Sequence, residues 1–460
     1  MTKGKNEFMR RKSIKIGIAI LILLSNICVT PQQIEAKGLT SLIMPSVEST
    51  TKSIGNTNVH IVSAKKGDSS NKIQSLLDLN KDGAYGKLVV KIPAGDYYFD
   101  KTLYVYSNTT LILEEGAKVH KQKAYGAIIE GKLISDNGGY DGCKNIVIDG
   151  GVWDASAMMN QKGGTEQIRF IHASNIVIRN AEFSNISEGS HFVVFAGVQN
   201  GTIENCSFHG YGNDGDSYRN PKEAIQLDIV HNNKIVPTAQ KVKWDDLPCK
   251  NITIRNCEFY DYSRAIGSHT TVAGVYHEGI VIKDNIIHDM EEVAIRLYQY
   301  KDSVISGNTI TNCATGIMLY TRTGFTNESA YYKPLNGIVQ PEPEKTNVVL
   351  EGNTIKNMLS SNKEYGNAIH ISGITQLPIS YIIVKDNQIY NVEQNGIFVT
   401  GTNHVEVSEN VIRKSKKYGI LFERNNKNEK IINNKVRGAE ISDIFVLKGS
   451  SMAEIIGNKK

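Results

Sequence analysis

The stretch Ile254-Arg-Asn-Cys-Glu-Phe259 is one copy of a six-residue pattern that recurs along this chain of 460 residues. Each of nine copies begins with an aliphatic residue, has a turn former near its middle and ends on an aromatic or aliphatic residue. From Phe183 to Val436, these last residues are spaced 25, 51, 28, 23, 45, 34, 23 and 24 apart. A period of about 23 to 25 residues, with a strand, a turn and a second strand in each unit, is typical of a solenoid.

The fourth position of each copy predicts how the turns stack. Six later copies have Asn there, and three earlier copies have Ala or Cys: Asn285, Asn308, Asn353, Asn387, Asn410, Asn434, Ala181, Cys206 and Cys257. Asn tolerates turn conformations, and stacked Asn side chains can bond one another. The same position predicts buried, stacked thiols in place of disulfides. No Cys-x-x-Cys occurs, which argues against a zinc site.

The chain is expected to have three parts. Residues 1–36 combine a basic start, an apolar stretch and a small-residue cleavage site, which predicts a signal peptide and a secreted protein. Residues 37–58 are rich in Ser and Thr and are interpreted as a linker, and residues 59–460 as the solenoid. Beyond residue 36 the net charge falls from +5 to about +1, with no basic stripe that indicates nucleic acid. We expect a monomer without a membrane anchor.

The start of the solenoid carries a family resemblance. Residues 71–79 have helical spacing and are expected to cap its open end. The strand-like runs Leu88–Tyr97 and Leu103–Gly116 follow, and they resemble the first coils of the pectin-lyase-like right-handed β-helix superfamily, especially its polygalacturonase branch. This resemblance implies an all-β fold, a single-stranded right-handed parallel β-helix of roughly ten or more coils with an N-terminal capping helix.

A second strand in each coil predicts two outward rows of side chains. These strands include Glu223–Asp228 and Val293–Tyr298, and alternation places their Ile and the residue two later inside. The first outward row is then Gln226, Gly267, Arg296, Met318, His370, Phe398 and Leu421. The neighbouring row is Asp228, His269, Tyr298, Tyr320, Ser372, Thr400 and Glu423. Polar and titratable groups gather in the first three coils of these rows.

Two long insertions, Val230–Pro248 and Thr321–Thr346, flank this polar patch, whereas the link Thr270–Glu278 between them is short. Two walls beside a low floor predict a groove for an extended polymer. Trp244 in the first wall could stack on a sugar ring, or simply pack its own loop. His277 in the link could also reach the groove.

Four carboxylates are predicted to converge beside the groove: Asp214, Asp216, Glu223 and Asp228. Glycosidic hydrolysis needs one carboxyl to protonate the leaving oxygen and another to activate water or attack the sugar. A solvated acidic loop would have the same composition. The run Asp214-Gly-Asp216 is also compatible with Ca²⁺ binding, but it lacks the spaced ligands of an EF-hand. We therefore expect no cofactor or metal.

Two basic side chains complete the predicted site. His269 is one coil from Asp228 in the same row, where a carboxylate could orient its ring; the alternative is an ordinary surface histidine. Arg296 could bind the carboxylate of a uronic acid, or form a salt bridge to Asp228 or Glu223. Gln226 and Tyr298 are the remaining expected sugar contacts.

The layout is similar to that of the polygalacturonases, which place Asn-x-Asp, Asp-Asp, Gly-His-Gly and Arg-x-Lys motifs on successive coils. The chain has Glu223-Ala-Ile where that family has Asp-Gly-Ile, Gly267-Ser-His269 near the His motif, and Arg296-Leu-Tyr298 near Arg-x-Lys. It has no adjacent Asp pair at Arg264, and Tyr298 stands at the motif lysine.

These observations favour a secreted glycoside hydrolase acting on an extended polysaccharide, either neutral or uronate-containing. Asp228 is the expected general acid, with Glu223, Asp214 or Asp216 as its partner and His269 adjusting the site. A polysaccharide lyase is the second reading, in which Arg296 or His269 would act at the uronate and Tyr298 would donate to the leaving oxygen. The third is a non-catalytic glycan-binding surface protein.

Overall fold

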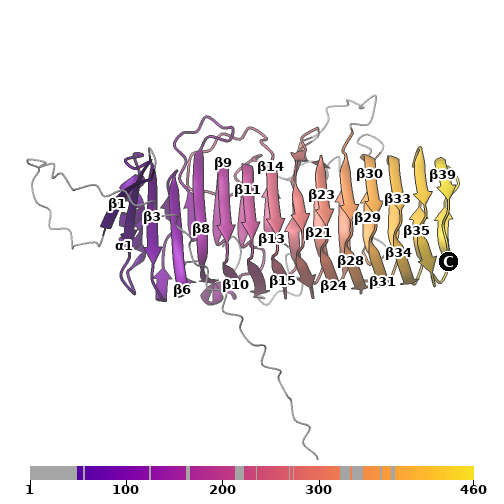
Figure 1. Ribbon diagram of the computed structural model, residues 1–460, viewed down its shortest axis with the longest axis horizontal. Coiled ribbons are helices and arrows are strands. Elements are labelled where there is room, and N and C mark those ends of the chain that lie inside the picture. Colours follow the sequence, from indigo (N-terminus) through magenta and orange to yellow (C-terminus); the bar gives the residue numbers. More distant parts are fainter. Residues whose placement is uncertain are drawn as a thin grey trace, which may run out of the picture. The chain divides into compact units, whose positions relative to one another are not determined.

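The structure, a computed structural model, describes residues 49–54, 57–123, 126–161, 166–212, 222–234, 236–268, 270–272, 274–321, 332–333, 345–362, 365–374 and 379–460. Nearly all regular elements in these residues are strands, and successive rungs pair in parallel. Figure 1 shows strands of successive rungs side by side in sequence order. The right-handed parallel β-helix predicted from the repeat is therefore confirmed.

The first ladder contains the second strands of the repeat, joined in parallel from rung to rung. It consists of β5 (Leu103–Val105), β7 (Ile129–Gly131), the first parts of β9 (Ile168–Arg179) and β11 (Val193–Glu204), β13 (Glu223–Asp228), β16 (Arg264–Gly267), β21 (Val293–Tyr298), β25 (Thr315–Tyr320), β29 (Ile369–Ser372), β32 (Ile397–Thr400), β35 (Tyr418–Phe422) and β38 (Ser442–Val446).

The second ladder carries the start of the six-residue pattern. It consists of β2 (Thr57–Ser63), β3 (Lys87–Ile92), the first parts of β6 (Thr109–Lys121) and β8 (Cys143–Asp154), the ends of β9 and β11, β14 (Lys250–Arg255), β19 (Val281–Lys283), β23 (Ser303–Ser306), β27 (Val348–Glu351), β30 (Ile379–Lys385), β33 (Thr402–Ser408), β36 (Glu429–Ile432) and β39 (Met452–Ile456).

The third ladder carries the end of the pattern. It consists of β4 (Gly95–Phe99), the ends of β6 and β8, β10 (Glu182–Ile186), β12 (Ser207–Tyr211), β15 (Glu258–Tyr260), β20 (Ile286–His288), β24 (Thr309–Cys313), β28 (Thr354–Met358), β31 (Gln388–Val392), β34 (Val411–Ser415) and β37 (Lys435–Arg437).

The core is built from side chains of the same kind stacked in register. In the third ladder, the rings of Phe183, Phe208 and Phe259 stack with centroids 5.0 and 4.9 Å apart. Aliphatic residues continue this column in later rungs, and all are buried: Ile287, Ile310, Ile355, Ile389, Ile412 and Val436. Parallel strands lie about 4.8 Å apart, so identical side chains in register meet at contact distance.

The predicted Asn position forms a continuous buried amide ladder. Each Asn donates through Nδ2 to Oδ1 of the next, over 2.9 to 3.0 Å, from Asn285 to Asn458. The residue before each of these adopts a positive φ, as Asp386 does at 56°. Earlier rungs place Cys206 and Cys257 in the same position, and Cys257 N donates to Asn285 Oδ1 at 3.0 Å. The ladder thus gives hydrogen-bond partners to polar groups that would otherwise be buried without them.

The five described cysteines are free and buried, which confirms the thiols predicted at Cys206 and Cys257: Cys143, Cys206, Cys249, Cys257 and Cys313. Burial raises the pKa of Cys143, Cys249 and Cys313 to about 12. They are therefore thiols that pack as small apolar groups. Within the described residues, no group of His, Cys, Asp and Glu is arranged to hold a metal ion, and no helix is long and apolar enough to cross a membrane.

The N-terminal end is covered by a short helix, as the sequence predicts. Helix α1 (Ser70–Leu77) and the 3₁₀ turn η1 (Asp78–Asn80) bury Ile73, Leu76 and Leu77 against the first rungs. Strand β1 (Ser49–Ile54) lies within the stretch interpreted as a linker and pairs antiparallel with β2. It adds a strand to the edge of the second ladder.

Asn353→Ala should destabilise the fold through the amide ladder. Asn353 Oδ1 accepts bonds from both nitrogens of Asn308, which would lose their partner in the core. We expect a loss of about 3 kcal/mol in the free energy of unfolding, measured by chemical denaturation. The control is Asn357→Gly, which removes an exposed amide bond to Asn312 at a positive φ that glycine accepts. It should cost less than about 1 kcal/mol, and equal losses would contradict the role of the buried ladder.

Candidate functional site

The first outward row is in register over the predicted rungs. Gln226 pairs with Gly267, Gly267 with Arg296, and the row continues through Met318, His370, Phe398 and Leu421. In the second row, Tyr298 pairs with Tyr320 and Tyr320 with Ser372. The first predicted row is therefore in register on the first ladder, and so is the second row from Tyr298 to Ser372.

The Glu223 carboxylate is the centre of a buried ion network. It accepts bonds from Arg296 Nη2 at 2.7 Å and from Arg264 Nη1 at 3.2 Å. Arg264 also bonds Glu292 through Nε at 2.8 Å, and His191 Nδ1 lies 2.6 Å from the Glu223 carbonyl oxygen. The salt-bridge alternative for Arg296 is thus the one found. Its guanidinium also lies over the Tyr298 ring, 5.1 Å from the centroid.

Asp228 is fully buried beside Gln226. Gln226 Nε2 donates to Asp228 Oδ2, and the backbone N–H of Ile229 donates to Oδ1 at 2.9 Å. Burial raises the pKa of the Asp228 carboxyl to about 7, and the nearby carboxylate of Glu223 acts in the same direction. The raised pKa keeps this carboxylic acid partly protonated at neutral pH, so it can act as a proton donor.

The expected groove does not expose these side chains. Glu223, Gln226 and Asp228 have 0 % of their surface accessible, and Tyr298 has 5 %. Glu223 and Asp228 are five positions apart on β13, a rise of about 16 Å along the backbone. The carboxyl separation of about 6.5–9.5 Å in an inverting glycosidase therefore does not follow from their positions along the strand. Glu223 is placed as the partner of two arginines more directly than as the partner of Asp228.

His277 lies inside the β-helix, which corrects its placement in the groove. It belongs to β18 (His277–Glu278), which pairs with β22 (Tyr300–Lys301) at the corner before the second ladder. Its Nδ1 accepts the backbone N–H of Cys249 at 3.0 Å, and its ring lies 5.1 Å from that of Tyr300. Burial lowers the pKa of His277 to about 3, so it is a neutral core residue.

The first insertion folds over earlier rungs of the same ladder. Val230 and Val236 pack against Val194 and Ala196 on the outer face of β11, where they form a small second core. Trp244 is 38 % exposed on this insertion. In the link, β17 (Thr271–Val272) pairs with β26 (Tyr332–Lys333) of the second insertion. His269, Asp214 and Asp216 lie outside the described residues, so their predicted roles stay predictions.

The structure adds buried charges that sequence reasoning missed. Arg169 is in the same row as Gln226, two rungs earlier, with Val194 between them. It bonds Glu166 at 2.5 Å and lies 3.6 Å from Glu130. Extending the row toward the N-terminus would have found Glu130 and Arg169. Arg264 belongs to the same group of buried charges. Its position opposite Glu223 in the aligned second strands is the sequence signal that predicts this pair.

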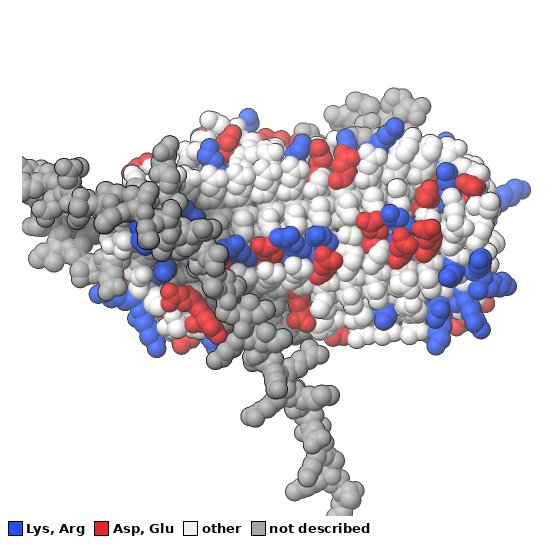
Figure 2. Space-filling model, in the orientation of Figure 1, with Lys and Arg blue, Asp and Glu red and all other residues white. Residues whose placement is uncertain are grey.

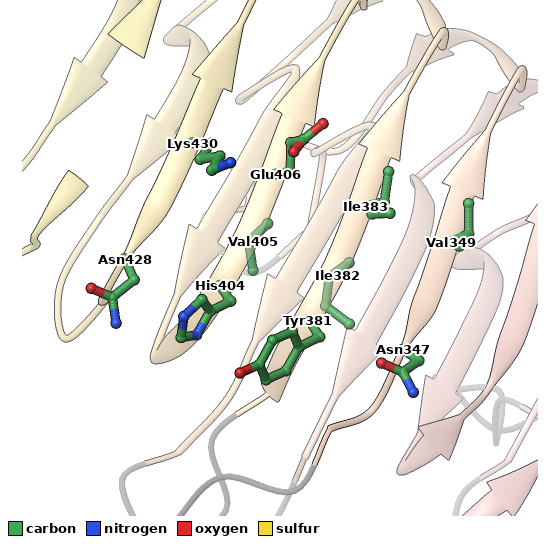
Figure 3. A pocket seen from close by; sticks show the side chains of 10 residues that line it. All are labelled: Asn347, Val349, Tyr381, Ile382, Ile383, His404, Val405, Glu406, Asn428 and Lys430. Carbon is green, nitrogen blue, oxygen red and sulfur yellow. The ribbon is translucent and has the colours of Figure 1, made fainter. Parts of the chain in front are cut away.

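A separate hollow lies on the second ladder, outside the predicted rows. Its volume is about 340 Å³, and Figure 3 shows Asn347, Tyr381, His404 and Asn428 in one row along its edge. The parallel rings of Tyr381 and His404 stack 4.6 Å apart. None of the residues predicted for the site lines it.

Comparisons with known proteins assign this chain to a structural class. The fold and its polar outward rows define a right-handed parallel β-helix protein. The family described as the right handed beta helix region matches residues 230–373 and 325–459, and rhamnogalacturonase A/epimerase, pectate lyase-like matches residues 56–258. The chain belongs to the pectin-lyase-like right-handed β-helix superfamily. A search of curated protein sequences finds no match.

Several solved structures share the fold at low sequence identity. The surface adhesin PfbA of Streptococcus pneumoniae has a TM-score of 0.64 at 20% identity, over 82% of this chain and 87% of that chain. The GH87 α-1,3-glucanase of Streptomyces thermodiastaticus has 0.56 at 13%, over 86% and 67%. The tailspike of E. coli bacteriophage HK620, in complex with pentasaccharide, has 0.51 at 10%, over 81% and 68%.

Arg264→Met should destabilise the protein more than the loss of a surface pair. It removes the Arg264 guanidinium from the fully buried Glu223 carboxylate, for which we expect a cost of about 3–5 kcal/mol by chemical denaturation. The matched control is Arg255→Met, whose pair with Glu204 is on the surface, with the Arg255 side chain 43 % exposed. It should cost less than about 1 kcal/mol, and similar costs would argue against the buried network.

Asp228→Asn should change how stability depends on pH. The folded pKa of about 7 lies above the ordinary 3.8. The contribution of the Asp228 proton to the free energy of unfolding is therefore full below about pH 4 and is lost as pH rises to about 7. Asn does not ionise, so the variant should gain stability relative to wild type between pH 4 and pH 8, by up to about 4 kcal/mol. Denaturant titrations at both pH values measure this difference. A constant difference would contradict the raised pKa.

Proposed function

We propose that this protein is an extracellular glycoside hydrolase that cleaves an extended polysaccharide, with Asp228 as the general acid. The observation that carries the proposal is the Asp228 carboxyl, which lies on an outward row of the β-helix and has a pKa raised to about 7. A carboxylic acid that is still protonated near neutral pH can give its proton to a leaving glycosidic oxygen. The expected signal peptide supports action outside the cell.

The neighbouring groups suit a sugar polymer. Arg296 and Tyr298 lie on β21, two rungs from the β13 strand of Asp228, and an arginine fork can bind a uronate carboxylate once its pairing with Glu223 is exchanged. Structures with the same fold include an α-1,3-glucanase and a tailspike bound to a pentasaccharide, which supports a polysaccharide partner. Asp214 or Asp216 would supply the second carboxyl, since Glu223 is held by two arginines.

A second candidate function is glycan binding without catalysis. The complete burial of Glu223, Gln226 and Asp228 favours it, because buried groups that bond one another can serve structure alone. The similarity in fold to a pneumococcal surface adhesin agrees with this reading. The two candidates differ in what happens to turnover when Asp228 is changed.

Asp228→Asn should reduce turnover by at least about 100-fold while the protein still binds its polysaccharide, because general acid catalysis contributes that much or more. Purified protein would be tested on polygalacturonate and on neutral glucans. New reducing ends report hydrolysis, and ultraviolet absorbance of an unsaturated product reports elimination. Turnover by wild type should fall above about pH 7 as the acid loses its proton.

The matched control is Glu429→Gln. Glu429 is also fully buried with a pKa raised by burial to about 7, but it bonds Thr402 and Lys427 at the second ladder, remote from Asp228 in sequence. This variant should lose stability and keep turnover within about twofold of wild type. Wild-type protein without turnover on every polysaccharide, or equal turnover by wild type and Asp228→Asn, would reject the hydrolase in favour of a binding protein.

A further inference from the structure

The last rungs carry an excess of positive over negative charge. Residues 411–460 contain twelve Lys and Arg residues against five Asp and Glu, a formal net charge of +7. The +5 of the whole chain, less this +7 and the +4 of residues 1–36, leaves −6 for residues 37–410. Figure 2 shows Lys and Arg gathered near the C-terminal end, at the lower right. A nearly neutral total therefore conceals a basic surface.

Four cations of this segment and one from an earlier rung form two adjacent rows, which we together call the basic stripe: Lys356, Arg413, Lys435, Arg437 and Lys459. These side chains are exposed on the outer face of the third ladder and its continuation. Lys356 pairs in register with Tyr390, Tyr390 with Arg413, and Arg413 with Arg437. In the adjacent row, Lys435 is in register with Lys459. The stripe thus runs along the stacking direction over consecutive rungs.

The cations of the stripe have no acidic partner within the part of the chain that the structure describes. Lys356 Nζ and Arg413 Cζ lie 5.6 and 5.9 Å from the ring centroid of Tyr390 between them. Other lysines in the same rungs are paired, such as Lys416 with Glu393 at 2.8 Å and Lys385 with Glu351 at 3.1 Å. The stripe is therefore a charge arrangement that the fold leaves uncompensated.

Stacked like charges cost stability in a sheet. Adjacent strands are about 4.8 Å apart, and like charges directly opposite one another are destabilising. Arg413 and Arg437 are in this arrangement, as are Lys435 and Lys459. The inward neighbours Ile412 and Val436 already supply the packing of these rungs, so the cations add nothing to the core. An anionic partner would offset their repulsion.

We propose that the basic stripe binds a linear, carboxylate-bearing polysaccharide laid along the β-helix axis. The stripe presents cations one or two rungs apart along the stacking direction, with Tyr390 between Lys356 and Arg413, which suits an extended polyanion. Arginine forks match carboxylates, and the Tyr390 ring offers an apolar surface to a sugar ring. The choice of a polysaccharide over a nucleic acid rests on the proposed function. The stripe lies on the third ladder and the candidate site on the first, so it holds the polymer independently of cleavage.

The experiment measures binding of sodium polygalacturonate in the Asp228→Asn background, so that the polymer is not cut. Wild-type stripe should bind with an affinity that falls as salt rises. The triple variant Lys356→Gln, Arg413→Gln, Arg437→Gln should weaken binding at least about tenfold and flatten the salt dependence. The matched control Lys87→Gln, Lys118→Gln, Lys144→Gln removes three exposed cations elsewhere and should change affinity less than about twofold.

Three outcomes would overturn the proposal. One is no binding of polygalacturonate by the intact stripe, and another is equal weakening by the two triple variants. The third is tighter stripe-dependent binding of polyphosphate or duplex DNA than of polygalacturonate, tested in parallel. Because binding is read without turnover, a failed hydrolase proposal leaves this measurement interpretable, and a failed stripe leaves the Asp228 test unchanged.

Discussion

The structure depends on in-register stacking, in which each rung must match the next at about 4.8 Å. The matching concerns polar groups as much as apolar ones, because a buried amide without a partner costs about 1–3 kcal/mol. The Asn ladder from Asn285 to Asn458 meets this requirement by repeating one bond in every rung. Where the ladder ends, Cys257 donates its backbone N–H to Asn285, and the smaller thiols take over. Rungs with different side chains can thus join without a gap.

Stacking also explains why chemistry gathers on one sheet. Outward residues are free of the packing rule, so a row can change from Arg296 to Met318 to His370 within three rungs. The first ladder holds charged residues, among them Glu223, Asp228 and Arg264, and all three are buried. Glu223 bonds two arginines, whereas Asp228 bonds Gln226 and has a pKa raised to about 7. The difference arises from partners: cations for one, an amide and burial for the other.

The repeat made the fold and the row register predictable, because a period of two along strands and one rung per repeat fixes which residues are neighbours. Gln226, Gly267 and Arg296 were placed correctly for that reason. The burial of the row was not predictable, since it depends on what the connections cover. His277 was misplaced because the two-residue strand β18 lies at a corner, where alternation does not reveal the side of the chain that a residue faces. The pairing of Glu223 with Arg264 follows the same register, because the two residues are partners on β13 and β16, so the aligned repeats already contained the signal for it.

The buried cysteines have a consequence for assembly. Thiols whose pKa is raised to about 12 are almost never present as thiolates, the form that attacks oxidants and forms cross-links. Cys143 and Cys249 therefore stay reduced thiols whatever the redox potential of the medium in which the chain folds. The β-helix can reach the same covalent state in a reducing or an oxidising medium, without an oxidase or an isomerase to pair its sulfur atoms.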